Sequence, residues 1–218
     1  MNLLHTAHVP AGEGPFPTIL ALHGWGASAH DLLGLAPMLP KDTLMISPQG
    51  RVELEIAPGM KGYGWFRLVP GQPPDVEAFK RASEGLGTFS EEMLQRFPCD
   101  PGKVVALGFS QGGVMGFDLA LRSPKRFAGL VALSTWLPEM LATDFSLDPD
   151  LRGFPVLMLH GRQDAMIEAE KARKSKDILE AMGVDLTYQE FDMGHEISRD
   201  ALATLVEWLE ATIRPSKS

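Results

Sequence analysis

The sequence predicts an α/β fold in which a mostly parallel sheet carries helices on both of its faces. Short apolar runs that end in Gly, Pro, Ser or Asp alternate along the chain with segments whose apolar residues recur at helical spacing. Such runs are typical of buried parallel strands, and repeated strand–helix units favour right-handed crossovers onto one sheet. The length of 218 residues, of which 44% are hydrophobic and 22% charged, suits one domain with a sizeable core. We therefore expect residues 1–218 to form a single domain.

Six strands are expected in chain order. Each is a short apolar run bounded by turn-forming residues, and all six are expected to be buried. They are PTILALHG at 17–24, DTLMISP at 42–48, KVVAL at 103–107, FAGLVALST at 127–135, FPVLMLHG at 154–161 and VDLTYQEFD at 184–192.

Five helices are expected around these strands, because apolar residues recur there at positions three or four apart. They cover residues 31–39, 75–97, 111–123, 168–182 and 197–213. Two connections remain. Residues 49–74 read as one long irregular stretch, rich in Gly, Pro and aromatic residues, and residues 136–153 form a second insertion after a strand. Loops as long as the first are often functional.

The charge balance, the N-terminal sequence and the cysteine count exclude several classes of protein. Lys and Arg number 20 against 28 Asp and Glu, and no basic cluster runs along one face, so nucleic acid is not an expected partner. The start, MNLLHTAHVPAG, has neither a basic region nor a long apolar run, and no stretch reaches the roughly 18 apolar residues of a membrane span. Cys99 is the only cysteine, which excludes an internal disulfide and favours a cytoplasmic location.

Chemically active side chains follow several of the expected strands. His23 and Trp25 come at the end of the first strand, Ser110 after the third, Asp164 after the fifth and His195 after the last. Ligands of parallel sheets bind at the carboxyl ends of the strands. The sequence therefore predicts that a nucleophile, an acid and a base meet at one edge of the sheet.

The pattern GFSQG at 108–112 predicts how Ser110 is presented. This G-x-S-x-G pattern is weak evidence alone, but here it lies between an expected strand and an expected helix. That context matches a nucleophile elbow, a strained turn that lifts the serine hydroxyl clear of the sheet. Gly108 and Gly112 would then be small because neighbouring backbone passes close to the turn. The alternative is a helix N-cap serine followed by a loose turn.

His195 and an acid complete a possible triad. A lone histidine is more often a surface or structural residue, but His195 lies between the last strand and the last helix. The order Ser, Asp, His is that of α/β-hydrolases. Asp164 is the favoured acid because it lies in a separate loop that can approach the imidazole from the side away from the serine. Asp192 and Glu168 are its rivals.

A catalytic metal and an organic cofactor are not expected. His195-Glu196 lacks the second histidine four residues after the first that a zinc-binding helix would carry. His5, His8 and His30 also lack the spacing of metal ligands.

Four motifs together resemble the phospholipase/carboxylesterase family of small α/β-hydrolases, which includes the acyl-protein thioesterases. They are ALHGWGASAHD, similar to the family's oxyanion loop, GFSQGG, similar to its elbow, HGRQD, similar to its acid loop, and MGHEI, similar to its base turn. The resemblance covers residues 15–212 and keeps the family's order. It implies Ser110 as nucleophile, His195 as base, Asp164 as the acid that orients it, and the backbone N–H groups of Trp25 and Gln111 as oxyanion hole. The chain departs from the family at Trp25, where relatives often carry a small or aliphatic residue, and after HGRQD, where an apolar residue and proline are usual.

The implied reaction is hydrolysis of an ester or thioester of a small or lipid-like acyl compound by a monomer or homodimer. A peptidase of the same fold and a catalytically silent binding protein are the alternatives. Trp25 is expected to fill the acyl side of the cleft, which would favour short acyl chains, so that Trp25→Leu would shift the optimum toward longer esters. The alternative is that it packs against residues 49–74. Six apolar side chains either line an acyl pocket or belong to the core: Trp65, Phe66, Met115, Trp136, Leu137 and Met166.

Overall fold

The computed structural model describes residues 3–68, 75–145 and 149–213. Its main feature is a seven-stranded sheet in the order β1-β3-β2-β6-β7-β8-β9. All neighbouring pairs from β3 to β9 are parallel, and only β1 runs antiparallel, against β3. The strands are β1 (His5–His8), β2 (Phe16–Leu22), β3 (Leu44–Pro48), β6 (Cys99–Phe109), β7 (Gly129–Leu133), β8 (Pro155–Gly161) and β9 (Asp185–Phe191). The predicted mostly parallel sheet is confirmed.

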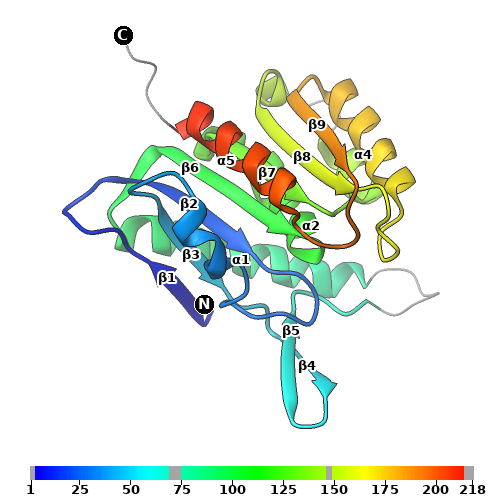
Figure 1. Ribbon diagram of the computed structural model, residues 1–218, viewed down its shortest axis with the longest axis horizontal. Helices are drawn as coiled ribbons and strands as arrows, with labels where there is room; N and C mark the ends of the chain where they lie inside the picture. The colour runs from blue at the N-terminus through cyan, green and yellow to red at the C-terminus, as the bar shows by residue number, and fades with distance from the viewer. Residues whose placement is uncertain (1–2, 69–74, 146–148, 214–218) are drawn as a thin grey trace.

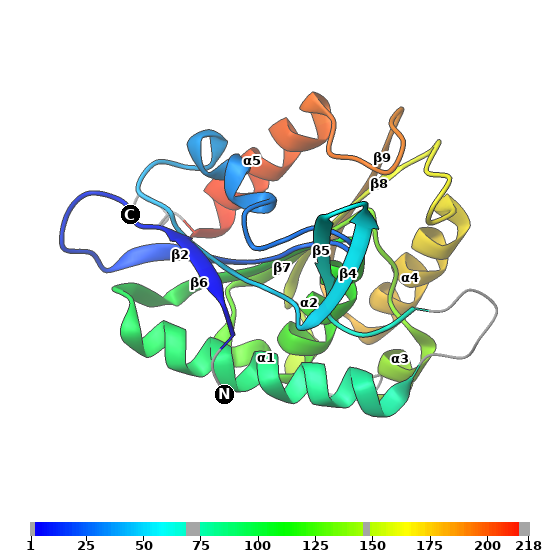
Figure 2. The same ribbon diagram turned by 90° about the horizontal axis from the view of Figure 1, so that it is seen from below.

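Helices cover both faces of the sheet, as Figure 2 shows. Helices α1, α2, α3 and α4 lie on one face, whereas α5 and the 3₁₀ helix η1 lie on the other. Their bounds are α1 (Val76–Arg96), α2 (Gln111–Arg122), α3 (Glu139–Phe145), α4 (Ala169–Met182), α5 (Arg199–Ile213) and η1 (Leu32–Met38), and two shorter 3₁₀ turns are η2 (Pro124–Arg126) and η3 (Pro149–Leu151).

The core is divided by the sheet into two layers, because alternate side chains of a strand point to opposite faces. In β2, Leu20 and Leu22 belong to the layer under α1, α2 and α4, whereas Ile19 and Ala21 belong to the layer under η1 and α5. The central strands are therefore mostly apolar, with few polar exceptions such as Thr18 in β2 and His160 in β8. This packing is why they read as continuous apolar runs in the sequence.

Several helix ends follow local sequence signals. Asp75 caps α1, since its side chain accepts a hydrogen bond from the backbone N–H of Ala78 at 2.9 Å. Gly183 ends α4 at φ 79°, in the left-handed region that glycine enters without a Cβ penalty. None of the helices in the described residues is long and apolar enough to cross a membrane.

The prediction for residues 49–74 was wrong in part. Strands β4 (Val52–Ala57) and β5 (Met60–Gly64) pair as an antiparallel hairpin that extends away from the main sheet (Figure 1). Pro58 and Gly59 form the turn, and side chains along β4 alternate between half-buried and exposed at its start. The Gly and Pro content suggested an irregular loop, but the hairpin needs them at its turn and where β5 meets other backbone. Residues 69–74 lie outside the described residues.

Two other expectations need correction, and one strand was missed. The segment 31–39 is a short 3₁₀ helix with Pro37 inside it, and proline removes a backbone donor that an α-helix would use. Strand β9 is half exposed in alternation because it forms the edge of the sheet, so it is not fully buried. Strand β1 was not predicted, since HTAH is short and polar.

Candidate active site

Ser110 lies in a strained turn between β6 and α2. Its φ of 54° places it in the left-handed region, which residues other than glycine seldom adopt and which occurs often at functional sites. The turn is fixed on both sides. The Ser110 N–H donates to the carbonyl of Leu133 at 2.9 Å, and the hydroxyl of Thr135 donates to the Ser110 carbonyl at 2.7 Å. The serine is partly exposed at the carboxyl end of β6.

The two glycines of the GFSQG motif have the function that the sequence suggested. A Cβ on Gly108 would overlap the backbone of Gly112, the second residue of α2. A Cβ on Gly112 would overlap the carbonyl oxygen of Leu22 at the end of β2. Any side chain at either position would therefore push the elbow away from the sheet.

Asp164 and His195 form a direct hydrogen bond. The distance from His195 Nδ1 to Asp164 Oδ2 is 2.7 Å. Asp164 follows β8 and its side chain is fully buried, whereas the side chain of His195 is 16% exposed. The structure thus brings together the acid and base that the sequence predicted, with one face of the imidazole accessible to solvent.

Asp164 is held in its charged form. Burial alone would raise the pKa of its carboxyl, but hydrogen bonds from the Ile167 N–H, from His195 and from the Met166 N–H outweigh burial and lower the pKa. The two backbone donors lie 2.8 and 2.9 Å from Oδ1. Because Oδ1 is occupied in this way, Oδ2 is directed at the imidazole.

The rival acids lie elsewhere. Asp192 has a side chain that is 79% exposed and pairs with Arg162 at 3.0 Å. Glu168 is exposed at the N-terminus of α4. Only Asp164, among the three candidates, contacts the His195 ring.

Several contacts place the His195 turn beside the serine elbow. The ring of His195 packs against the ring of Phe109, the residue before Ser110, with 4.9 Å between centroids. The hydroxyl of Ser134, which follows β7, donates to the carbonyl of Glu196 at 3.3 Å. The nucleophile, acid and base therefore follow the carboxyl ends of β6, β8 and β9, which lie at the same edge of the sheet with β7 between β6 and β8.

The loop after β2 lies beside the same elbow. A Cβ built on Gly24 would be 3.3 Å from the Ser110 Cβ, so the backbone of this loop runs close to the serine. His23 fixes the start of the loop: its Nδ1 donates to the Gly24 carbonyl at 2.7 Å and its Nε2 accepts from the Gly50 N–H at 3.0 Å. Burial lowers the pKa of the His23 imidazole, more strongly than the hydrogen bond to Gly24 raises it. The ring is therefore neutral, as these two bonds require.

The sequence and the structure of this chain were compared with those of known proteins. A family model described as phospholipase/carboxylesterase matches residues 6–213. The chain belongs to the phospholipase/carboxylesterase family. A curated relative in Gibberella zeae, named acyl-protein thioesterase 1, is 25% identical over 225 residues, which cover 94% of each chain.

Solved structures show the same α/β-hydrolase fold. Esterase PE8 aligns with a TM-score of 0.85 at 23% identity, covering 97% of this chain and all of that one. A Bacillus cereus carboxylesterase aligns with a TM-score of 0.79 at 22% identity, covering 96% of this chain and 94% of that one. Membership of the family identifies this protein as an enzyme that hydrolyses esters or thioesters.

In this member of the family, Trp25 packs against the β4–β5 hairpin. Its indole lies over Gly64, where a Cβ would overlap the six-membered ring. The loop backbone is joined to β5 as well: the Gly26 N–H donates to Tyr63 O, and the Tyr63 N–H to Ala27 O, both at 2.8 Å. Of the two expectations for Trp25, these contacts agree with packing against residues 49–74.

We therefore expect Trp25→Leu to leave the acyl-chain preference of the enzyme unchanged. The indole supports the loop against Gly64, so its loss should lower stability by about 1 kcal/mol, a value typical of a lost packing contact. Hydrolysis rates over a series of p-nitrophenyl esters, with thermal unfolding beside them, measure both effects. A shift of the optimum toward longer esters would instead place the indole in the path of the acyl chain.

The six apolar candidates for an acyl pocket lie in different surroundings. Met115 is fully buried in the core, Leu137 is 4% exposed, and Met166 is 74% exposed on the acid loop. Trp136 is half-buried and packs against the core. Trp65 and Phe66 are buried and line one cavity together, which Ser110, Asp164 and His195 do not line. Core packing, the alternative for these residues, describes Met115 and Leu137, and Trp65 and Phe66 also belong to the same buried core.

Three side chains with roles at the site were not recognised from the sequence. His23 holds the loop after β2, as described above. The side-chain amide of Gln111 accepts from the Trp65 N–H at 2.9 Å and donates to the Phe66 carbonyl at 2.7 Å. His160 is fully buried, and its Nε2 donates to the Ile167 carbonyl at 2.8 Å and lies 3.6 Å from Asp164 Oδ2. The motifs HGWG, GFSQGG and HGRQD contain these residues, but their side-chain contacts depend on chain packing.

Within the described residues, no group of three or more His, Cys, Asp or Glu side chains is placed to hold a metal ion. Asp164, His195 and His23 contact one another or the backbone, whereas His160 Nδ1 is buried with no hydrogen-bond partner among the described residues.

Proposed function

We propose that this protein is a serine hydrolase that cleaves carboxylic esters or thioesters through an acyl-enzyme, as one domain acting as a monomer or homodimer. The observation that carries the proposal is the 2.7 Å hydrogen bond between Asp164 and His195 beside the strained turn of Ser110. A buried carboxylate, an imidazole and a serine in this order are the parts of a nucleophilic triad.

The first half of the reaction forms the acyl-enzyme. His195 Nε2 takes the proton of the Ser110 hydroxyl as the serine oxygen attacks the carbonyl carbon of the substrate. Asp164 accepts a hydrogen bond from Nδ1–H, which keeps the proton on Nδ1, leaves Nε2 free to act as base and stabilises the imidazolium that forms. His195 then gives its proton to the alcohol or thiol that leaves, and the acyl group remains on Ser110. In the second half, His195 activates a water that releases the acid.

The negative charge on the reacting oxygen requires hydrogen-bond donors. We assign the backbone N–H groups of Trp25 and Gln111 to this role. Gln111 is the first residue of α2, so the helix dipole also favours negative charge there. Trp25 lies on the loop that passes Ser110, and its position is fixed by His23 and β5. Loss of one such donor typically costs about 3 kcal/mol of transition-state stabilisation.

The substrate class follows from the family and remains broad: small or lipid-like acyl compounds. A panel of p-nitrophenyl esters, acyl thioesters, lysophospholipids and peptides separates the proposed activity from its alternatives. Hydrolysis of esters or thioesters with no peptide cleavage is the expected result. Preferred peptide cleavage would identify a peptidase, and no turnover of any compound would identify a silent binding protein.

Activity is expected to decline on acidification. A protonated imidazole has no free lone pair, so a charged His195 cannot accept the Ser110 proton. Asp164 does not produce this decline, because its lowered pKa keeps it ionised until the pH falls below the usual range of aspartate. A pH profile of kcat/KM measures the effect.

Thermal unfolding at each pH is the control for that profile. The lowered pKa of His23 means that the unfolded chain binds this proton more readily than the folded chain, so stability also falls below about pH 6.5. Full activity retained at pH 5 in the folded protein would contradict the role of His195 as base.

A further inference from the structure

A cavity of about 600 Å³ lies at the base of the β4–β5 hairpin, beside the first half of α1. This volume falls in the range of small-molecule sites, about 300–1,000 Å³. Its wall is largely apolar and comes from Leu3, Val52, Trp65, Phe66, Ala78 and Ala82. No residue of the candidate triad lines it, so it is separate from the reacting atoms.

Three arginines from separate segments border this cavity. Arg51 follows β3, Arg67 follows β5 and Arg81 lies on α1. In the part of the chain that the structure describes, the side chains of Arg67 and Arg81 form no hydrogen bond or ion pair. Two acids, Asp75 and Glu84, also line the cavity. The Asp75 carboxylate is already used to cap α1. The arginines outnumber the acids in a chain whose formal net charge is −8.

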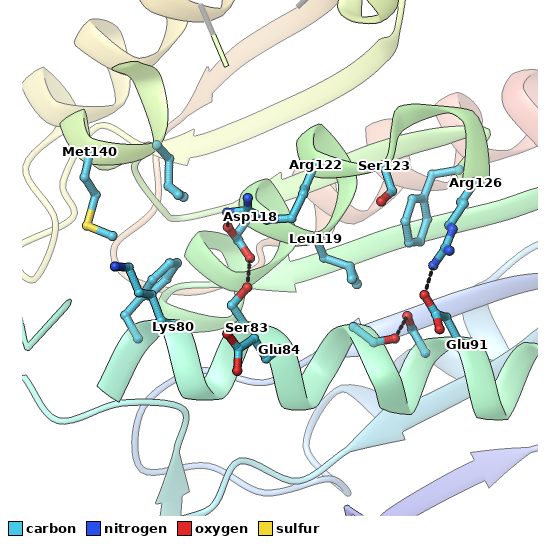
Figure 3. A pocket seen from close by; sticks show the side chains of 15 residues that line it. Lys80, Ser83, Glu84, Glu91, Asp118, Leu119, Arg122, Ser123, Arg126 and Met140 are labelled. Carbon is cyan, nitrogen blue, oxygen red and sulfur yellow. Dashed lines mark hydrogen bonds and ion pairs between the residues drawn. The ribbon is translucent and has the colours of Figure 1, made fainter. Parts of the chain in front are cut away.

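In a second cavity, of about 420 Å³, the arginines already have carboxylate partners. It lies between α1 and α2, and four of its six charged side chains pair with one another (Figure 3). Ser83 donates to Asp118, which also accepts from Arg122 at 2.6 Å, and Arg126 pairs with Glu91. A charged ligand there would have to displace existing partners.

We propose that the cavity below the hairpin binds an unbranched fatty-acid anion, with its chain on the apolar wall and its carboxylate between Arg67 and Arg81. Guanidinium groups pair with carboxylates through two parallel hydrogen bonds, and an apolar wall with a few convergent charges is the composition of a ligand site. The choice of a carboxylate rests on the proposed function, whose product is a carboxylic acid. The ligand site itself does not depend on turnover.

The Gln111 side chain connects the wall of the cavity to the candidate active site. Trp65 and Phe66 form part of its wall, and the Gln111 side chain binds the backbone of both at 2.9 and 2.7 Å. The backbone N–H of the same Gln111 is assigned to the oxyanion hole. A bound fatty acid would therefore lie one side chain away from the residues that stabilise the transition state.

Calorimetric titration of the full-length protein with decanoate tests the proposal without any catalytic step. We expect binding to weaken about tenfold in the double variant Arg67→Gln/Arg81→Gln, since partly exposed charge pairs contribute modestly each. Decanol, which has the same chain and no charge, should bind this variant and the wild type within about threefold of each other. Equal decanoate binding by both proteins would overturn the assignment of the arginines.

A glycine pair on α1 provides a matched test of the position. Gly85 is buried and lines the cavity, and a Cβ there would meet no atom within 4 Å. Gly85→Leu should therefore fill the cavity and reduce decanoate binding more than tenfold, a loss on the order of the apolar contacts removed. Gly87→Leu is the control, because Gly87 has the same open space on the same helix but lines the other cavity.

Neither leucine is expected to lower Tm, since leucine favours helix over glycine. Loss of decanoate binding in Gly85→Leu alone supports the site. Equal binding in both variants, or no binding by the wild type, overturns it. Absence of esterase activity together with intact decanoate binding would contradict the proposed function and leave the fatty-acid site in place.

Discussion

Replacement of Ser110 by alanine is expected to lower kcat for ester hydrolysis by about 10⁶, the loss seen when a serine nucleophile is removed from a triad. The reason is that the acyl-enzyme forms on the Ser110 oxygen, and no other group in the turn can take its place. Residual turnover then comes only from binding and from the oxyanion hole. Hydrolysis of a p-nitrophenyl ester under saturating conditions measures the loss.

Ser134 supplies a matched control for this variant. It follows the neighbouring strand β7, is buried, and has a positive φ of 45°, as Ser110 has one of 54°. Its hydroxyl, however, donates to the Glu196 carbonyl at 3.3 Å. We expect Ser134→Ala to retain activity within about tenfold, a cost typical of one weak hydrogen bond. Comparable losses in the two variants would remove the distinction between nucleophile and support.

Replacement of Asp164 by asparagine is expected to lower kcat by about 10⁴. The Oδ1 atom of asparagine can still accept from the Ile167 and Met166 N–H groups, so the loop should keep its conformation. The amide nitrogen then faces His195 Nδ1 as a donor. This arrangement forces the proton of the ring onto Nε2, where it blocks abstraction of the Ser110 proton.

The same substitution at Asp192 separates the two acids. Asp192 is exposed and pairs with Arg162, and exposed pairs of this kind contribute little. Asp192→Asn should therefore cost less than about tenfold in kcat. Circular dichroism and thermal unfolding of both variants confirm that the comparison is made between folded proteins. A larger loss at Asp192 than at Asp164 would move the orienting acid to Asp192.

The parts of the fold that the sequence predicted well are those with strong local signals. The central strand β7 is apolar at every position, and β2 is apolar except for Thr18, because both faces of these strands are covered. The turn at Ser110 was predictable because Gly108 and Gly112 have no space for a side chain. The order of Ser110, Asp164 and His195 along the chain then indicated which strand ends to compare.

Features that depend on packing were predicted less well. The β4–β5 hairpin contains Gly62 and Gly64, which suggested a loop, yet both are glycine because β5 lies against the backbone and ring of the loop after β2. The direction of the Trp25 side chain was open for the same reason. Composition also could not separate Met115, a core residue, from a residue of an acyl pocket, since apolar side chains suit both places.

The central claim is that Ser110 is the nucleophile that becomes acylated. A fluorophosphonate probe followed by peptide mapping tests it most directly. Fluorophosphonates react with activated serines and leave a stable mass on the residue attacked. The account predicts one labelled site, Ser110, among the 12 serines of the chain, with loss of labelling in Ser110→Ala and strong reduction in Asp164→Asn. A label on another serine, or none on the active wild-type enzyme, would contradict it.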